Sequence, residues 1–363
     1  MADPTDRAVA ENLARELSRL GHRVCLVGPC RSNGEPFQGV SEGIPIYRVG
    51  GGGASEELAV RQLLRIDSQE GIDVWHCHVF GRSHRALARA ARRGGWPLLL
   101  TLHLVLEDYL PFLGGKAGLR SLLGAACHVT AVSRAARQEF LESFPEWRKR
   151  SSVVYNGPRP PAAELPIPRA VPRPYILCVA RLAPYKGQDL LLMAWARMSG
   201  ECPGWSLVLC GRDQTRGGLR RLVRALGLQD SVILTGDLPP PQVDGLLRDC
   251  EFFVLPSRRE NFPLAVLEAM RAGKAVIASA AGGTGEMLRD GIDGLLAPPC
   301  DVDALSRLML ELSRDCALRR RLGRRALSAS RKFSWRRAAA AYARLYRRAA
   351  PSRRRAAGMR SKK

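Results

Sequence analysis

Two basic residues in a strand-to-helix loop are the first candidates for chemistry. Arg181 and Lys186 follow the apolar run Tyr175–Ala180, which predicts a buried strand. Gly187 comes next, just before a predicted helix. Cations at the carboxyl end of a strand, beside the amides of a helix start, form a site for a diphosphate. Taken alone the pattern is weak, because two solvated loop cations would give the same spacing.

Two glutamates eight residues apart strengthen this interpretation. Glu260 follows the predicted strand Phe252–Pro256, and Pro263 can start the next helix. A loop carboxylate there can bind sugar hydroxyls, while amides at the helix start face a phosphate or sugar oxygen. Glu268 lies about two turns into the same, otherwise apolar, helix. It needs a partner if it is buried, and ribose hydroxyls would supply one. The alternative is an exposed Glu on the polar face.

The elements that position these residues alternate between strand and helix in two stretches of the chain. In the first stretch we predict a helix over Asp6–Leu20 and strands over Arg23–Gly28, Ile44–Val49, Asp73–His78, Pro97–His103, His128–Ser133 and Val153–Tyr155. In the second we predict strands over Tyr175–Ala180, Ser206–Cys210, Val232–Thr235, Phe252–Pro256, Ala275–Ser279 and Gly294–Ala297. Several runs lack polar alternation, as parallel strands covered on both faces do. The sequence therefore predicts an α/β fold with two doubly wound domains.

A proline-rich segment divides the two stretches. We predict a first domain over 1–157, an extended linker over 158–174 and a second domain over 175–334. A helix at about 335–348 is expected to pack back on the first domain, followed by a basic disordered tail over 349–363. Open α/β sheets bind ligands beyond the carboxyl ends of their strands. Two such sheets would face each other across a cleft.

Three motifs, in this order and spacing, carry a resemblance to a known family. They are R-x4-K-G at Arg181–Gly187, E-x7-E from Glu260 to Glu268, and GG-x-x-E at Gly282–Glu286. The sequence resembles the GT-B glycosyltransferases, specifically the large retaining family four, and the likeness runs from Arg7 to about Arg348. The resemblance implies two Rossmann-like domains and an enzyme that uses a nucleoside diphosphate-sugar. Its acceptor would be a lipid, a saccharide or a small molecule, in cell-surface polysaccharide or glycolipid synthesis.

The resemblance also implies residue roles. Arg181 and Lys186 would neutralise the donor diphosphate and the leaving group, Glu260 would contact donor-sugar hydroxyls, and Glu268 would hold the ribose. Further residues are expected to shape the donor pocket: Gly211, Leu238, Asn261, Phe262, Pro263, Leu264, Gly282 and Gly283. Fixed cations and helix-start amides stabilise a departing diphosphate without a metal. We therefore expect no metal and no cofactor besides the donor substrate.

Two histidines follow predicted strands of the first domain. The segments DVWHCH and PLLLTLH put His78 and His103 at strand carboxyl ends, facing the expected cleft. By resemblance, His103 is the active-site histidine that positions and polarises without bonding covalently, and His78 is a second candidate. A hydrogen-bonded structural histidine is the alternative for each. The segment Glu107–Ala126 adds Lys116 and Arg120 as acceptor-side candidates, although a plain amphipathic helix is equally consistent.

The start of the chain departs from the family pattern. The resemblance implies a strand and a Gly-Gly loop before the first helix, but only Met1–Asp6 precedes that helix here. The first strand of a doubly wound sheet is central, so we expect two strands to be left without a shared neighbour. Since the missing loop normally approaches the donor phosphates, a non-catalytic or truncated nucleotide-sugar-binding relative is the alternative function.

The net charge and the composition limit which kinds of partner the chain is expected to bind. The 363 residues carry a net charge of +23, and 50 of the 57 basic residues are Arg. Such a charge attracts phosphates, but a nucleic-acid binder would rest on charge alone, and we expect none. The tail after Leu345 carries eight basic residues, which we expect to contact an anionic membrane face.

Targeting and cysteine patterns complete the sequence-based picture. No run of about 20 apolar residues occurs, and Met1–Arg7 lacks the apolar core of a secretory signal. We therefore expect a cytoplasmic protein, peripheral on the inner face of the membrane. The ten cysteines include no C-x-x-C pair, which indicates reduced, structural thiols.

Overall fold

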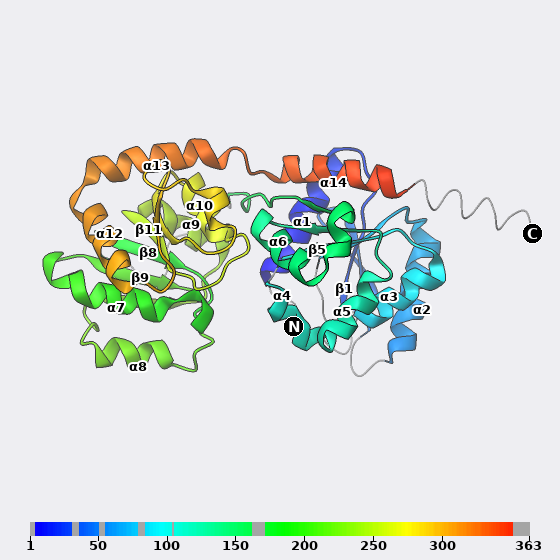
Figure 1. Ribbon diagram of the computed structural model, residues 1–363, viewed down its shortest axis with the longest axis horizontal. Coiled ribbons are helices and arrows are strands. Elements are labelled where there is room, and N and C mark those ends of the chain that lie inside the picture. The colour runs from blue at the N-terminus through cyan, green and yellow to red at the C-terminus, as the bar shows by residue number, and fades with distance from the viewer. Residues whose placement is uncertain are drawn as a thin grey trace, which may run out of the picture. The chain divides into compact units, whose positions relative to one another are not determined.

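The chain folds into two compact units. The computed structural model describes residues 4–30, 36–50, 55–78, 84–103, 105–161 and 171–350. The first unit comprises 1–157 and 334–363, and the second comprises 158–333 (Figure 1). The first unit thus contains both the N-terminal part and the C-terminal helix, and the proline-rich segment from Pro158 belongs to the second unit. Most of the predicted basic tail lies outside the described residues.

The first unit is an α/β unit. Its described helices are α1 (Pro4–Arg19), α2 (Glu56–Glu70), α3 (His84–Gly94), α4 (Leu106–Leu113), α5 (Gly115–Leu123), α6 (Arg134–Ser143), the 3₁₀ helix η1 (Pro145–Arg150) and α14 (Trp335–Ala349). Its described strands are β1 (Leu26–Pro29), β2 (Gln38–Ser41), β3 (Ile44–Val49), β4 (Trp75–Cys77), β5 (Leu98–Leu102), β6 (His128–Ala131) and β7 (Ser151–Val153). All six predicted strands are present, with ends shifted by up to three residues, and β2 is an additional strand.

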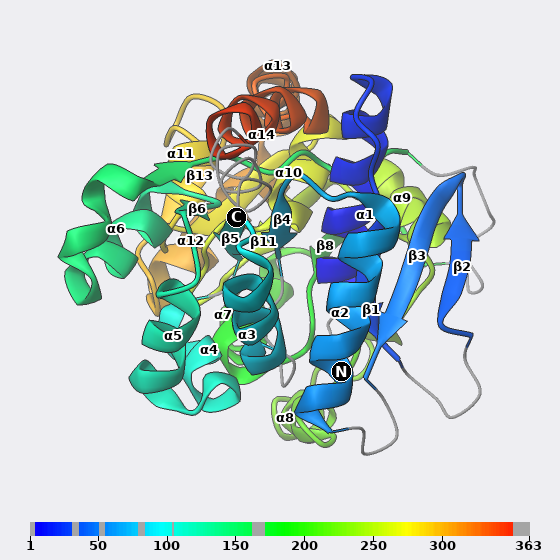
Figure 2. The same cartoon turned by 90° about the vertical axis from the view of Figure 1, so that its right-hand side faces the viewer.

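These strands form two separate sheets. One has the order β1-β3-β2, with β2 antiparallel to β3, and the other has the parallel order β4-β5-β6-β7. Within the described ranges, no strand joins β1 to β4 (Figure 2). The expectation of two strands without a shared neighbour is therefore confirmed.

The buried faces explain why these elements form. Strand β5 reads LLLTL and every residue in it is buried, as expected for a parallel strand between two helical layers. Helix α14 starts at Ser334, whose hydroxyl accepts a hydrogen bond from the Arg337 amide at 3.3 Å. The apolar residues Val9, Leu13 and Leu17 recur at helical spacing in α1 and are buried, whereas Leu20, which continues the same spacing beyond the helix end, is 47% exposed. Helix α1 packs against α14 (Figure 1).

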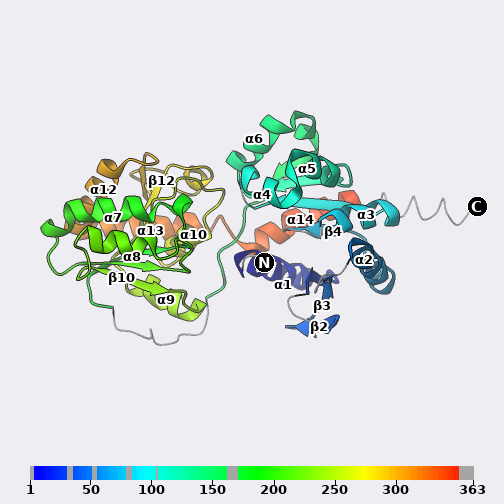
Figure 3. The same ribbon diagram turned by 90° about the horizontal axis from the view of Figure 1, so that it is seen from below.

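The second unit contains one continuous parallel sheet with the order β10-β9-β8-β11-β12-β13. Its strands are β8 (Tyr175–Val179), β9 (Ser206–Cys210), β10 (Val232–Gly236), β11 (Phe252–Leu255), β12 (Ala275–Ser279) and β13 (Leu295–Ala297). Its described helices are η2 (Pro184–Lys186), α7 (Gln188–Met198), η3 (Ser199–Glu201), α8 (Gly218–Ala225), α9 (Pro240–Asp249), α10 (Leu264–Arg271), α11 (Thr284–Met287), α12 (Val302–Arg314) and α13 (Cys316–Ser330). Helix α7 packs against α8 and α12 (Figure 3).

This strand order brings the predicted motifs together. Strands β9, β8, β11 and β12 are consecutive neighbours, so the loops that follow their carboxyl ends emerge at one edge of the sheet. One prediction of position is wrong: α10 begins at Leu264, and Pro263 is its N-cap. Only about one full helical turn therefore separates the start of α10 from Glu268, instead of the predicted two turns.

Two further sequence expectations concern membrane spans and thiols. None of the described helices combines the length and apolarity needed to cross a bilayer. All ten cysteines are free, as predicted. Burial raises the pKa of Cys178 to about 12, which keeps this thiol protonated.

Candidate active site

The centre of the site is an ion pair between two loops of the second unit. Lys186 Nζ lies 2.5 Å from Glu260 Oε1, and Ser257 Oγ donates to the same oxygen at 2.8 Å. The side chains of Lys186 and Glu260 are only 16% and 7% exposed. The interpretation of Lys186 as a solvated loop cation is therefore wrong.

Two glycines fix the backbone of Glu260. Gly282 has a φ of +51°, and a Cβ there would lie 1.6 Å from the Glu260 carbonyl oxygen. The Gly283 amide donates to the same oxygen at 3.3 Å. Only glycine allows the loop after β12 to approach this closely, so both predicted glycines lie against the Glu260 backbone.

The same close approach recurs at the neighbouring strand ends. A Cβ on Gly187 would lie 2.2 Å from the Pro256 carbonyl oxygen, which brings the loop of Lys186 against the end of β11. A Cβ on Gly211 would lie 1.9 Å from the carbonyl oxygen of Ala180, the residue before Arg181. The loops after four adjacent strands are thus packed backbone to backbone.

An aromatic ring that sequence reasoning missed contacts both predicted cations. The Tyr185 ring centroid is 5.7 Å from Arg181 Cζ and 5.4 Å from Lys186 Nζ. At these distances the ring attracts both cations. Gln188, which is 1% exposed, donates from Nε2 to the Arg181 carbonyl oxygen at 2.9 Å and so fixes the loop backbone.

The other predicted pocket residues surround the start of α10. Asn261, Phe262 and Pro263 are buried and Leu264 is partly buried, and no side chain caps the first amides of α10. Leu238 follows β10, the edge strand beside β9, and is also partly buried. Their predicted contacts with a donor remain predictions.

Glu268 has a partner within the chain. Arg159 Nε lies 3.5 Å from Glu268 Oε1, and Arg159 also forms a bidentate pair with Asp244 at 3.1 and 2.8 Å. The Glu268 side chain is 12% exposed, so the alternative of an exposed Glu is wrong. Burial raises the pKa of Glu268, although the charges of Arg159 and Arg271 oppose that shift. The ribose-binding role stays a prediction, and it would have to coexist with Arg159.

The first unit contains a cluster of three histidines. His78 Nδ1 lies 3.0 Å from His103 Nε2, so the two predicted histidines share a hydrogen bond. The ring of His76 lies 3.9 Å from that of His78, centroid to centroid. His76 was missed, although His76 and His78, two residues apart on a strand, share one face.

Helix α14 completes the cluster. The Tyr346 hydroxyl lies 2.6 Å from His76 Nδ1, and Thr101 Oγ1 lies 2.7 Å from His76 Nε2. The Tyr342 hydroxyl lies 3.1 Å from Thr101 Oγ1 and 3.3 Å from the hydroxyl oxygen of Thr130. These groups are hydrogen-bonded and uncharged.

Burial keeps the histidines neutral. It lowers the pKa of His78 to about 4, and it lowers the pKa values of His76 and His103 well below the usual range, an effect that neighbouring histidines reinforce. A neutral His103 can donate or accept one hydrogen bond at each ring nitrogen, and His78 occupies Nε2. Positioning of a substrate and a structural role are both compatible with this geometry.

Lys116 and Arg120 lie on α5 with exposed side chains. The Arg120 guanidinium lies over the Phe144 ring, 5.4 Å from its centroid. The predicted amphipathic segment is two helices, α4 and α5, and the Gly114 between them has a φ of +74°. Leu119, Leu122 and Leu123 of α5 are buried, so α5 packs on the core, as one of the two alternatives states.

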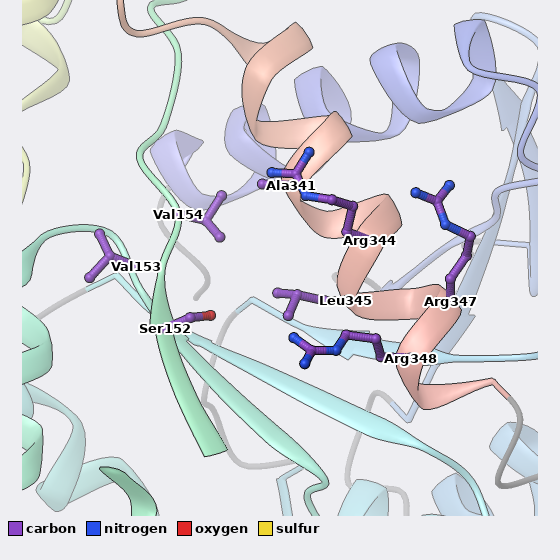
Figure 4. Close-up of a pocket in the computed structure, with 8 residues that line it drawn as sticks. All are labelled: Ser152, Val153, Val154, Ala341, Arg344, Leu345, Arg347 and Arg348. Carbon is purple, nitrogen blue, oxygen red and sulfur yellow. The ribbon is translucent and has the colours of Figure 1, made fainter. Parts of the chain in front are cut away.

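A cavity of about 560 Å³ lies between β7 and the last turns of α14 (Figure 4). Arg344, Arg347 and Arg348 line it together with the hydroxyl-bearing Ser152. Its apolar lining comes from Val153, Val154, Ala341 and Leu345. All the charged groups in this lining are positive.

Comparisons with known proteins agree with this architecture. The family model of glycosyl transferases group 1 matches residues 166–328, and that of glycosyltransferase family 4 matches residues 8–158. An uncharacterized glycosyltransferase of Methanocaldococcus jannaschii is 28% identical over 303 residues, which cover 82% of this chain and 78% of that protein. A D-inositol 3-phosphate glycosyltransferase of Streptomyces avermitilis is also 28% identical over 303 residues, covering 76% and 65%.

A third relative matches over a shorter stretch. An exopolysaccharide phosphotransferase of Streptomyces coelicolor is 36% identical over 180 residues, covering 46% of this chain. The chain spans only 19% of that protein's length and less than two thirds of the Streptomyces avermitilis protein.

Solved structures share the fold. Sucrose-phosphate synthase from Thermosynechococcus elongatus has a TM-score of 0.76 at 22% identity, covering 93% of this chain and 92% of that one. Anabaena HepE, solved in complex with UDP-glucose, has a TM-score of 0.68 at 22% identity, covering 84% and 86%. The predicted α/β fold class is therefore confirmed.

Proposed function

Since the chain belongs to the glycosyltransferases of group 1 and family 4, with the GT-B fold, we propose that it moves a sugar from a nucleoside diphosphate-sugar to a lipid, saccharide or small-molecule acceptor, with retention of configuration. The observation that carries the proposal is the buried Lys186–Glu260 pair, which lies beside Arg181 at the carboxyl edge of the second sheet. The expected setting is the synthesis of cell-surface polysaccharide or glycolipid.

The reaction breaks the bond between the sugar C1 and the diphosphate oxygen and forms one between C1 and an acceptor hydroxyl oxygen. The acceptor proton passes to the leaving diphosphate. Negative charge therefore grows on the diphosphate, and Arg181 and Lys186 would stabilise it as fixed cations. When the diphosphate binds Lys186, the carboxylate of Glu260 becomes available to accept hydrogen bonds from donor-sugar hydroxyls.

In this mechanism His103 positions and polarises the substrate as a neutral group. Attack from the face of the departing diphosphate needs no protein nucleophile, so none is assigned. We also propose that no metal and no cofactor are required, because the two cations supply the positive charge. Transfer should therefore continue in EDTA, and loss of turnover that Mg²⁺ or Mn²⁺ restores would refute this part of the proposal.

The decisive experiment combines donor binding with turnover. A thermal-shift screen should include UDP-, GDP- and ADP-sugars, beginning with UDP-glucose because a structural neighbour was solved with it. Arg181→Ala and Glu260→Gln should each lower transfer or donor hydrolysis by about 10²-fold or more. Arg220→Ala, an exposed arginine on α8, is the matched control and should leave turnover unchanged. Unchanged turnover in the first two variants would refute the proposal.

One observation favours the alternative of a non-catalytic nucleotide-sugar-binding protein. The first unit has two sheets where the second has one, so no central strand holds the loops of the first unit at a single sheet edge within the described residues. That alternative predicts donor binding by calorimetry without transfer to any member of a broad acceptor panel. Turnover with any acceptor would exclude it.

We further propose that α14 contacts an anionic membrane surface, as a peripheral protein would. The cavity lined by Arg344, Arg347 and Arg348 lies immediately before the basic tail and supports this step (Figure 4). Arginines near an anionic bilayer contribute about 1 kcal/mol each. Vesicles containing phosphatidylserine should bind the protein, and Arg344→Glu with Arg348→Glu should weaken that binding by about 30-fold or more.

The matched control for membrane contact is the pair Arg320→Glu and Arg324→Glu on α13, which changes the net charge equally on an exposed helix of the second unit. Equal loss of vesicle binding in both double variants would show that only net charge matters, and it would overturn the assignment to α14.

A further inference from the structure

Arg258 connects the two loops that carry the Lys186–Glu260 pair. Its Nη1 and Nη2 donate to Asp189 Oδ1 and Oδ2 at 2.8 and 2.6 Å, which is a bidentate ion pair. Nη1 also donates to the Pro184 carbonyl oxygen at 2.6 Å, and the Arg258 amide donates to the Tyr185 carbonyl oxygen at 2.9 Å. One residue thus makes four hydrogen bonds to the segment that contains Lys186.

Two ion pairs, Arg258–Asp189 and Lys186–Glu260, join the same two chain segments and so form a closed ring of contacts. Arg258 is two residues before Glu260, and Asp189 is three residues after Lys186. Asp189 is also the second residue of α7, whose positive N-terminal end favours a carboxylate. The pair therefore ties the Lys186 loop, the start of α7 and the Glu260 loop to one another.

The charge and exposure of Arg258 and Asp189 indicate how this closed set of contacts acts. Burial alone would raise the pKa of Asp189, but the hydrogen bonds and charge of Arg258 and the amides of the helix start hold it below its usual value. The hydrogen bonds to Asp189 raise the pKa of Arg258, so both groups stay ionised. Their side chains are 31% and 33% exposed, so the pair is partly buried, and its two parallel hydrogen bonds fix the geometry of the guanidinium against the carboxylate. The four hydrogen bonds of Arg258 join the Glu260 loop to residues 184–189, so the pair constrains the local geometry of both loops.

We propose that Arg258 and Asp189 form a clamp that positions Lys186 and Glu260 for the donor diphosphate. This inference rests on the proposed function. When a diphosphate draws Lys186 away from Glu260, the direct tie between these side chains weakens, and the clamp keeps the two loops in place. Arg258 and Asp189 are positioning residues, because they act through Lys186 and Glu260.

The surroundings of the clamp leave room to test it. A cavity of about 730 Å³ borders it, lined by Tyr185, Asp189, Arg258 and Arg259 among others. Arg258→Ala and Arg258→Lys can therefore be made without overpacking. The Lys variant keeps the charge but loses the planar fork that binds two carboxylate oxygens at once.

The test compares ligands with and without phosphates by titration calorimetry. Arg258→Ala and Asp189→Ala should each weaken UDP or GDP binding about 10-fold, while affinity for uridine or guanosine stays the same. The double variant should lose no more than either single variant, because both remove one interaction. Arg258→Lys should recover part of the loss. Arg197→Ala is the matched control, since Arg197 forms an exposed ion pair with Asp303 in the same unit.

A second measurement needs no nucleotide. Hydrogen exchange of the ligand-free protein should speed up at residues 183–187 and 257–261 in Arg258→Ala and not in Arg197→Ala. If the wild-type chain binds none of UDP, GDP and ADP, the proposed function fails, and exchange still decides whether the clamp exists. The clamp is refuted if exchange is unchanged, or if affinities for UDP and uridine fall equally, since that would indicate a merely structural role.

Discussion

The two units hold their polar side chains in opposite ways. In the second unit, charged residues are paired at the carboxyl edge of one continuous sheet, and glycines press the connecting loops together. In the first unit, uncharged histidines, tyrosines and threonines from three strands, β4, β5 and β6, and from α14 bond to one another.

This difference shows where each geometry originates. Strands β9, β8, β11 and β12 each have neighbours on both sides, so the ladder itself fixes the loops of the second unit. Strand β4 is at the edge of its sheet, and the His76 that it carries bonds to Tyr346 of α14. The charged site is therefore built into its own sheet, whereas the histidine cluster depends on the docking of α14.

Removing the central cation should have the largest effect, confined to the second unit. Lys186→Met leaves the buried carboxylate of Glu260 with only the Ser257 hydroxyl, which should destabilise that unit by about 3–5 kcal/mol. Urea unfolding with hydrogen exchange at β8 and β11 would measure this. Adding Glu260→Gln should recover much of the loss, and Lys149→Met, an exposed site in the first unit, should change little. An unchanged unfolding midpoint in Lys186→Met would contradict the pairing.

The glycine contacts allow a matched comparison within the second unit. Gly282 and Gly291 have φ values of +51° and +68°, but a Cβ on Gly291 would meet nothing within 4 Å. Both Ala variants should lose about 1–2 kcal/mol from the left-handed backbone. Gly282→Ala should lose about 1–3 kcal/mol more, because the Glu260 carbonyl must move. Equal denaturation midpoints for the two variants would show that the close approach does not matter.

Acid should distinguish the neutral cluster from the charged site. Because burial lowers the pKa values of His76, His78 and His103 below 6.5, only the unfolded chain takes up their protons as the pH falls from 6.5 toward 4. Stability of the first unit should fall with pH by up to about 1.4 kcal/mol per pH unit for each histidine. The pKa values of the facing Tyr342 and Tyr346 are raised, so they do not titrate there.

The measurement is the pH dependence of urea midpoints in the first unit. His78→Asn should flatten the slope between pH 6.5 and 5, and His22→Asn, which lies outside the cluster, should not. A wild-type slope identical to that of His78→Asn would mean that His78 takes up its proton equally in the folded and unfolded states, which would contradict its lowered pKa.

Removing either of two tyrosine hydroxyls should have the smallest effect on stability. Tyr346→Phe removes the hydrogen bond to His76, and Tyr175→Phe removes one to the Leu246 carbonyl oxygen in the second unit. Each should cost about 1 kcal/mol, in its own unit alone. Hydrogen exchange resolved by unit would measure both effects. Destabilisation of the second unit by Tyr346→Phe would contradict the expectation that each hydrogen bond stabilises only its own unit.

Much of the fold could be predicted because buried parallel strands leave a clear signal. Ser206–Cys210 and Ala275–Ser279 were predicted to the residue, since each contains a short, mainly apolar run and every residue in both strands is buried. Strand β2 was missed because Gln38–Ser41 is short, half-exposed and antiparallel to its neighbour. Its pairing depends on a hairpin rather than on burial.

The site could be predicted in position but not in its contacts. Motif spacing placed Lys186 and Glu260 at strand ends, yet their direct pairing joins residues 74 positions apart and follows only from strand order. Arg159 was not predicted as the partner of Glu268, because the proline-rich segment was interpreted as a connection alone. Arg258 lies next to the Glu260 motif, but only the fold brings it to Asp189.

The place of α14 in the chain has a consequence during synthesis. The apolar stripe of α1 and the histidines of the first unit leave the ribosome long before α14, because all of residues 158–333 are made in between. At about 5–20 residues per second, that delay is roughly 10–35 s. The second unit can finish folding in this interval while the first waits with its helix-binding face uncovered. In a cell, chaperones would therefore be expected to engage the earlier half of the nascent chain.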